Sequence, residues 1–139
     1  MRVAFLVNSG VGRSQANRRE DTLLVQFFLN RIWNRAEKGE AYGVPGKPPL
    51  PIDGVCGANT IAAIQRFQTL YYGAYGDVTI KDGIVHPTPA GRTHGPVHKQ
   101  TYTILALNLI FAAEYGKEKH MLMLNEPDFP QELRYVFYT

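Results

Sequence analysis

The sequence has little cysteine, little charge imbalance and no long apolar run. A single cysteine among 139 residues excludes an intramolecular disulfide framework and a cysteine-rich zinc site. Fifteen Lys and Arg against twelve Asp and Glu leave a formal net charge of +3, which is too small to require a nucleic-acid partner. The longest nearly apolar run, residues 104–113, is shorter than the roughly 20 residues of a membrane-spanning helix. We therefore expect neither a nucleic acid nor a membrane as partner.

The length and composition are those of a folded globular chain. Hydrophobic residues make up 45% and charged residues 19%, and 139 residues are typical of one domain, so we expect a single domain over 1–139. The apolar stretch at residues 3–7 is shorter than the roughly 7–15 residues of a signal-peptide core, and no Ala-x-Ala site follows it. We expect synthesis in the cytoplasm, and later delivery to the periplasm or the exterior by a secretion system stays open.

Three stretches with helical periodicity predict a mainly helical fold. They cover roughly residues 17–36, 60–71 and 99–115, and each places apolar side chains along one stripe. A loop rich in glycine and proline, residues 39–51, separates the first two. The expected core positions are Leu24, Phe27, Phe28 and Ile32 in the first stretch, Ile61, Ile64 and Phe67 in the second, and Ile104, Leu105, Asn108, Leu109 and Phe111 in the third.

Short extended or β segments are expected at both termini. Residues 3–7 form an apolar run, and residues 133–138 are rich in strand-forming side chains, so the two runs could pair. These segments belong to flanking extensions, 1–16 and 117–139, around a helical core at 17–115.

The most specific motif is an Asp-Gly turn that leads into the second helix. The carboxylate of Asp53 can accept backbone N–H groups, and Gly54 can adopt a positive φ. Gly57 allows a second close turn, and Asn59 or Thr60 is expected to cap the helix. The motif's apolar positions expected to face inward are Val55 and Cys56.

A second Asp-Gly turn precedes the third helix. Asp82 and Gly83 are followed by an apolar pair, as in the first turn, and then by Gly91 and Thr93. Two such turns, each leading into a helix, with one helix before the first, predict a pseudo-repeated three-helix unit.

These motifs resemble the peptidoglycan-binding-like domain family. The matching residues are Asp53 to Thr60, Phe67-Gln68 and Asp82 to Val85, and the resemblance covers roughly residues 20–115. The second turn is similar to a variant, Asp-Gly-x-Val-x-Pro-x-Gly-x-Thr, found in domains associated with type VI secretion and phage-like systems, with one extra residue before Gly91. The resemblance implies a small three-helix fold that binds cell-wall glycopeptide and performs no chemistry.

The expected ligand is peptidoglycan, through its stem peptide, in a groove between the turns and the helix starts. Tyrosines offer flat faces and hydroxyls, arginines can pair with ligand carboxylates, and N–H groups at helix N-termini can hold a carboxylate. Packing against the third helix is the alternative for the tyrosines. The candidate ligand-binding residues are Asn59, Thr60, Arg66, Tyr71, Tyr72, Tyr75, His86, Arg92 and Thr93.

The second hypothesis is a protein-interaction adaptor or accessory component of a bacterial secretion or phage-like system. Its partner would be a secreted effector or a protein of the secretion apparatus. The absence of an attached enzyme and the terminal strands, which could pair with a partner's sheet edge, favour it.

We expect no catalytic residue, no cofactor and no metal. Asp53 and Asp82 could form a carboxylate pair for acid–base chemistry, but each is followed by glycine in a turn, which favours a structural role. Cys56 would need a histidine nearby to act as a nucleophile. His94 and His98 have the spacing of two metal ligands on one helical turn, but Gly95 and Pro96 lie between them.

Overall fold

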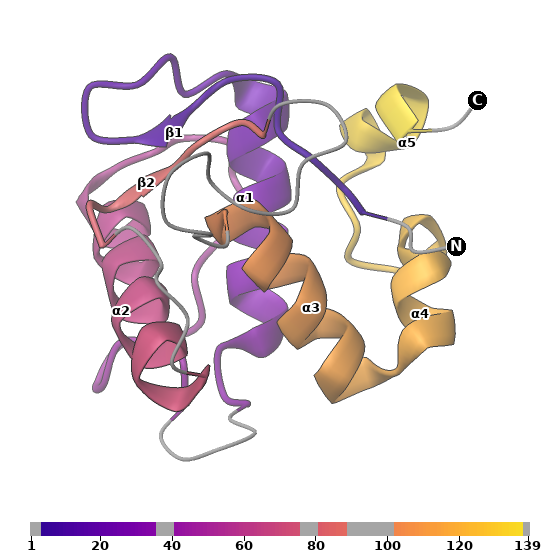
Figure 1. Ribbon diagram of the computed structural model, residues 1–139. Coiled ribbons are helices and arrows are strands. Elements are labelled where there is room, and N and C mark those ends of the chain that lie inside the picture. Colours follow the sequence, from indigo (N-terminus) through magenta and orange to yellow (C-terminus); the bar gives the residue numbers. More distant parts are fainter. Residues whose placement is uncertain (1–3, 36–40, 76–80, 89–101, 138–139) are drawn as a thin grey trace.

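The computed structural model describes residues 4–35, 41–75, 81–88 and 102–137, leaving aside the side chains of residues 72, 74, 75 and 135–137. Its five α-helices and one small two-stranded antiparallel sheet confirm the prediction of a mainly helical fold (Figure 1). In chain order the elements are β1 (Val11–Gly12), α1 (Arg19–Ile32), α2 (Ala58–Tyr75), β2 (Ile84–Val85), α3 (Thr103–Tyr115), α4 (Lys117–Met121), the short 3₁₀ helix η1 (Met123–Asn125) and α5 (Gln131–Phe137). No helix within these ranges is long and apolar enough to cross a membrane.

Helix α1 is the centre of the core. Every residue from 21 to 29 is buried, and α2, α3 and α5 all contact this helix. The ring of Phe27 lies 6.0 Å from that of Phe111 on α3 and 5.0 Å from that of Phe129, which precedes α5. Full burial of each such side chain contributes about 1.5–3 kcal/mol, so this aromatic cluster is a main source of stability.

The sheet joins the loop before α1 to the segment after α2. Val11 pairs with Val85 and Gly12 with Ile84 in antiparallel register. Val11 and Val85 are fully buried, so this short pair adds apolar contacts to the core as well as backbone hydrogen bonds.

Residues 4–7 form an extended arm, as expected, but not a strand. Phe5 and Val7 are buried, whereas Ala4 before them and Leu6 between them are exposed. The backbone of Phe5 is bound by the side chain of Asn108 on α3 instead of by another strand: Phe5 N–H donates to Oδ1 (2.8 Å), and Nδ2 donates to Phe5 O (2.9 Å).

The C-terminal segment is helical, so the predicted strand at residues 133–138 is wrong. Residues 131–137 form α5, which begins after Pro130 and buries Leu133, and residues 121–124 span the end of α4 and the start of η1. Packing against α1 overrides the strand propensity of this sequence. Arg31 of α1 holds the segment before α5 through ion pairs with Glu126 (2.8 Å) and Asp128 (2.9 Å).

Helix α3 corrects one predicted core position. Ile104, Asn108 and Phe111 are buried as expected, but Leu109 is 42% exposed. Ala106, Leu107 and Ile110, which were not predicted as core positions, are also buried. The buried face of α3 is therefore wider than the predicted stripe and does not include Leu109.

Candidate functional site

The first Asp-Gly turn is held by the side chain of Gln26 on α1. This side chain is buried, and its Oε1 accepts the N–H groups of Asp53 (3.0 Å) and Gly54 (2.8 Å). Its Nε2 lies within hydrogen-bonding distance of Asp53 Oδ1 (3.0 Å), Val55 O (3.0 Å) and Thr60 Oγ1 (3.1 Å). One glutamine therefore fixes the turn and joins it to the start of α2.

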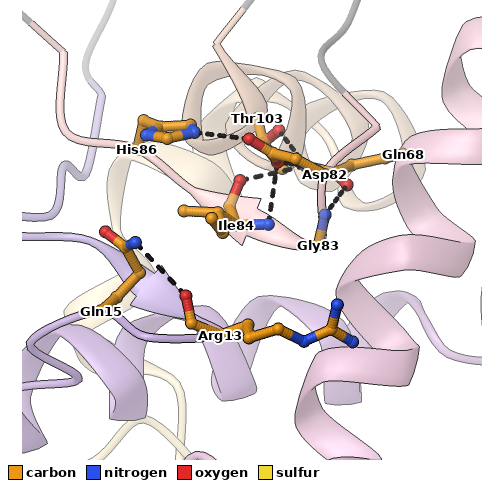
Figure 2. A network of polar contacts seen from close by, with 8 residues as sticks. All are labelled: Arg13, Gln15, Gln68, Asp82, Gly83, Ile84, His86 and Thr103. Atoms are coloured by element: carbon orange, nitrogen blue, oxygen red, sulfur yellow. Dashed lines mark hydrogen bonds and ion pairs between the residues drawn. The ribbon is translucent and has the colours of Figure 1, made fainter.

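The second Asp-Gly turn is held in the same way by Gln68 on α2 (Figure 2). The Oε1 atom of Gln68 accepts the N–H of Gly83 (2.9 Å). Its Nε2 lies 3.0 Å from Ile84 O, 3.0 Å from Thr103 Oγ1 and 3.4 Å from Asp82 Oδ1. Gln68 is fully buried, so this turn is joined to the start of α3 as the first is to α2.

The two turns are thus copies of one hydrogen-bonded unit, which we call the Gln/Asp-Gly/Thr unit. Gln26 and Thr60 are 34 residues apart, and Gln68 and Thr103 are 35 residues apart. In both turns Oδ1 of the aspartate accepts the N–H two residues later at 2.9 Å, and the glycine has a φ of +78° or +75°. Each unit takes its glutamine from one helix and its threonine from the next.

Thr103, rather than Thr93, completes the second unit. Thr60 follows Asp53 by seven residues, whereas Thr103 follows Asp82 by 21. The threonine that Gln68 contacts is therefore Thr103. Gly91 and Thr93, which were expected to match the motif, lie outside the described ranges.

The first turn differs from expectation in several details. Helix α2 begins at Ala58, and the carbonyl of Gly57 accepts the N–H of Ile61 (3.1 Å), so neither Asn59 nor Thr60 caps the helix. The expected second close turn is present, since the N–H of Gly57 donates to Val55 O (3.2 Å), but Gly57 has no positive φ and a Cβ there would meet no atom within 4 Å, so this turn does not require glycine. The expectation that Val55 faces inward is wrong, since its side chain is 65% exposed; Cys56 is half-buried.

The two turns differ at the second oxygen of the aspartate. In the second turn Asp82 Oδ2 binds Nε2 of His86 at 2.7 Å, and the equivalent position of the first turn is Gly57. The first turn instead lies beneath Arg19, whose Nη1 donates to the carbonyl oxygen of Asp53 (2.9 Å) while Nη2 pairs with Glu132 of α5 (2.8 Å).

The loop at residues 10–17 lies against both turns. Asn17 fixes it through two hydrogen bonds: Gly12 N–H donates to Oδ1 (2.7 Å), and Nδ2 donates to Gly12 O (2.9 Å). Gly12 also pairs with Ile84 next to the second turn, and its backbone N–H group acts to lower the pKa of the Cys56 thiol, which follows the first turn. The turns and the loop therefore form one continuous polar region.

Three of the predicted ligand-binding side chains are committed to internal contacts. Thr60 is buried within the first unit. The guanidinium of Arg66 donates to Gly43 O (2.8 Å) and Ala41 O (3.3 Å) and so holds the loop before α2. Tyr71 is buried with its ring stacked on Phe67, at a centroid distance of 5.7 Å.

The other predicted ligand-binding residues divide into two groups. Asn59 is exposed in the first turn of α2, and His86 is 38% exposed beside the second Asp-Gly turn. The side chains of Tyr72 and Tyr75, and the whole of Arg92 and Thr93, are outside the part of the chain that the structure describes.

The local environments bear on the acid–base and thiol chemistry considered above. The N–H of Val55 lowers the pKa of Asp53; partial burial opposes this effect, and the hydrogen bond from Gln26 adds to it. This carboxylate is therefore a poor proton donor at neutral pH. Burial raises the pKa of the Cys56 thiol against the effect of the Gly12 hydrogen bond, which favours the unreactive thiol form. Within the described ranges no group of three His, Cys, Asp or Glu side chains could hold a metal ion, and His94 and His98 lie outside them.

Gln26, which holds the first Asp-Gly turn, is the residue of this region that the sequence did not point to. It is the one polar residue in the run from Leu23 to Leu29, in the middle of the most buried stretch of the chain. A buried carboxamide must find partners for both its oxygen and its nitrogen, so a lone glutamine in such a run is a usable signal.

Comparison with known proteins adds no family to this description. No protein-family model matches the chain, and neither the curated proteins nor the solved structures contain a match to it.

Proposed function

We propose that this chain is a noncatalytic module that binds bacterial cell-wall peptidoglycan through its stem peptide. The observation that carries this proposal is the repeated Gln/Asp-Gly/Thr unit. The Asp, Gly and Thr of the first motif, and the Gln of Phe67-Gln68, are the groups that hold the turns together. Residues of the motif that resembles peptidoglycan-binding-like domains therefore belong to both units, which Gln26 and Thr103 complete, and we propose that α1, α2 and α3 form that three-helix core.

The proposed contact surface is the polar region formed by the two Asp-Gly turns and the loop at residues 10–17. Thr60 supports this surface from within the first unit, whereas Arg66 holds the loop before α2 and Tyr71 packs on Phe67, so these two are not proposed to contact the ligand. Asn59 and His86 are the exposed groups beside the two turns, and we propose that they contact the ligand. Arg92 follows His86 in sequence and is proposed to pair with a stem-peptide carboxylate.

Co-sedimentation with intact peptidoglycan sacculi tests this function. The protein is expected to pellet with sacculi at low salt and at ~150 mM salt, where attraction due to charge alone is weakened. The variant Asn59→Ala with Arg92→Ala is expected to lose at least about tenfold in affinity at the higher salt, as expected for a lost charge-assisted contact.

The matched control is Asn34→Ala with Lys47→Ala. It removes the amide of Asn34 and the cation of Lys47, which are both exposed and lie beyond the C-terminal end of α1. This control is expected to pellet like the wild type. A wild-type protein that fails to pellet, or pellets only at low salt, would show that the wall is not its ligand.

A protein-interaction role is the second proposal, and the exposed apolar side chains favour it. Leu109 on α3 is 42% exposed, and Met121 and Leu122 at the end of the adjoining helix α4 are 43% and 49% exposed. Large exposed apolar side chains are a feature of surfaces that bind other proteins. The partner would be a secreted effector or a component of a secretion apparatus. Failure to bind sacculi, together with a complex of defined stoichiometry in light scattering with such a protein, would favour this role.

A further inference from the structure

The extended arm, residues 4–7, is attached to α3 through one buried side chain. Asn108 is 4% exposed, and all of its polar capacity is used. Its Oδ1 accepts the N–H of Phe5, while its Nδ2 donates to Phe5 O (2.9 Å) and to Ile104 O (2.8 Å) in the preceding turn of α3. The backbone of Phe5 is thus held in place by the carboxamide of Asn108.

A histidine from α4 completes this attachment. Nε2 of His120 lies 2.8 Å from Asn108 Oδ1, and His120 is 6% exposed. Because Nδ2 of Asn108 donates to two carbonyl oxygens, its Oδ1 must be an acceptor, so Nε2 of His120 carries the hydrogen. In this neutral tautomer Nδ1 is the nitrogen that would take up a further proton.

The surroundings of His120 oppose a positive charge. The imidazole ring meets the ring of Phe5 edge to face at 5.6 Å and lies 6.1 Å from that of Phe111. Burial lowers the pKa of His120, and among the described residues no charged group contributes to the shift. The arm carries no titratable side chain at residues 4–7, α3 presents Asn108 and Phe111 to the ring, and the charged side chains of α4 itself are exposed: Lys117, Glu118 and Lys119.

We propose that His120 makes the arm an acid-released clasp: when a proton adds to Nδ1, residues 4–7 leave α3 while the helices remain folded. A buried cation between two phenyl rings, to which no carboxylate of the described residues is paired, is unfavourable until water reaches it. Displacing the arm admits that water, because Phe5 covers one side of the ring. Only Phe5 and Val7 of the arm are buried, so the arm can open with much less loss of buried surface than the core.

The direction of the pH effect follows from the two states. With the arm released, the pKa of His120 approaches its ordinary value of 6.5, whereas in the docked state it is lower. Above pH 6.5 both states are neutral and docking is at its strongest. Below pH 6.5 the released state binds the proton first, so each further pH unit shifts the equilibrium toward release by up to about tenfold, until the docked pKa is reached.

Nuclear magnetic resonance on the intact protein tests the clasp. The exchange protection of the Phe5 amide, corrected for the intrinsic effect of pH, is expected to fall by up to about tenfold per pH unit below 6.5, in step with the titration of the His120 ring. The amide of Phe27 in α1 is expected to keep its protection. Titration of His120 without loss at Phe5, or loss at Phe5 and Phe27 together, would overturn the proposal.

Two variants separate the clasp from other acid effects. In His120→Gln the amide can still donate to Asn108 Oδ1 but cannot be protonated, so protection at Phe5 is expected to be independent of pH. His86→Gln removes a histidine beside the second turn and is expected to keep the wild-type pH dependence. Persistence of the pH dependence in His120→Gln contradicts the proposal. If that variant does not fold, the proposal is judged from the protection of the Phe5 and Phe27 amides in the wild type.

Discussion

Replacing Gln26 by alanine is expected to lower the free energy of unfolding by about 3–5 kcal/mol. The change leaves the N–H groups of Asp53 and Gly54 and the hydroxyl of Thr60 without their buried partner. Each buried polar group left unsatisfied costs about 1–3 kcal/mol, and the missing side chain also leaves a cavity next to α1. Urea denaturation followed by the fluorescence of Trp33 measures the effect.

Gln68→Ala is expected to have a similar effect, because the second unit is built in the same way. Gln65→Ala is the matched control. Gln65 lies on the same helix and is partly exposed, and among the described residues its carboxamide takes no part in the hydrogen bonds of the second unit. We expect this control to lose less than about 1 kcal/mol. Equal losses at all three glutamines would mean that the units do not hold the turns.

Gly12→Ala is expected to cost about 3 kcal/mol or more. Gly12 has a φ of +139°, which side-chain-bearing residues rarely adopt. A Cβ there would lie 2.4 Å from the carbonyl oxygen of Gly83 and 2.9 Å from Cα of Ile84, and both are backbone atoms that cannot rotate away. The substitution therefore forces β1 away from β2 and disturbs the second turn.

Gly57→Ala is the control for this substitution. A Cβ at Gly57 meets nothing within 4 Å and φ is not positive, so we expect no loss and a gain of up to about 1 kcal/mol, because alanine restricts the unfolded chain. Thermal denaturation of the two variants by circular dichroism gives the comparison. Equal melting temperatures for both would contradict the assigned close contact at Gly12.

The parts of the fold that depend on local pattern could be predicted from the sequence. Helices α1 and α2 each carry an apolar stripe, α3 is a long apolar run, and the two Asp-Gly turns are set by residues adjacent in the chain. Helix α5 could not be predicted, because its seven residues are too few for a periodic signal and several of them favour strands. It forms where Leu133 and Phe129 can pack on α1.

The candidate site is held together by contacts between residues that are far apart in the sequence, so most of these contacts could not be predicted from the sequence. Composition and spacing indicated the turns, but not that Gln26 reaches Thr60 or that Gln68 reaches Thr103. The same limit explains Arg66: an arginine near a turn suggests a ligand carboxylate, whereas two backbone carbonyls of the loop before α2 are its partners here.

The repeated unit also sets an order in which the chain can close during folding. The contact from Gln26 to Thr60 spans 34 residues and that from Gln68 to Thr103 spans 35, so each can form once the following helix begins, whether or not the rest has folded. The contact from Phe5 to Asn108 spans 103 residues and requires α3 to be in place. The arm, although early in the sequence, is therefore expected to dock last, and its loss is expected to be the first step when the native state opens.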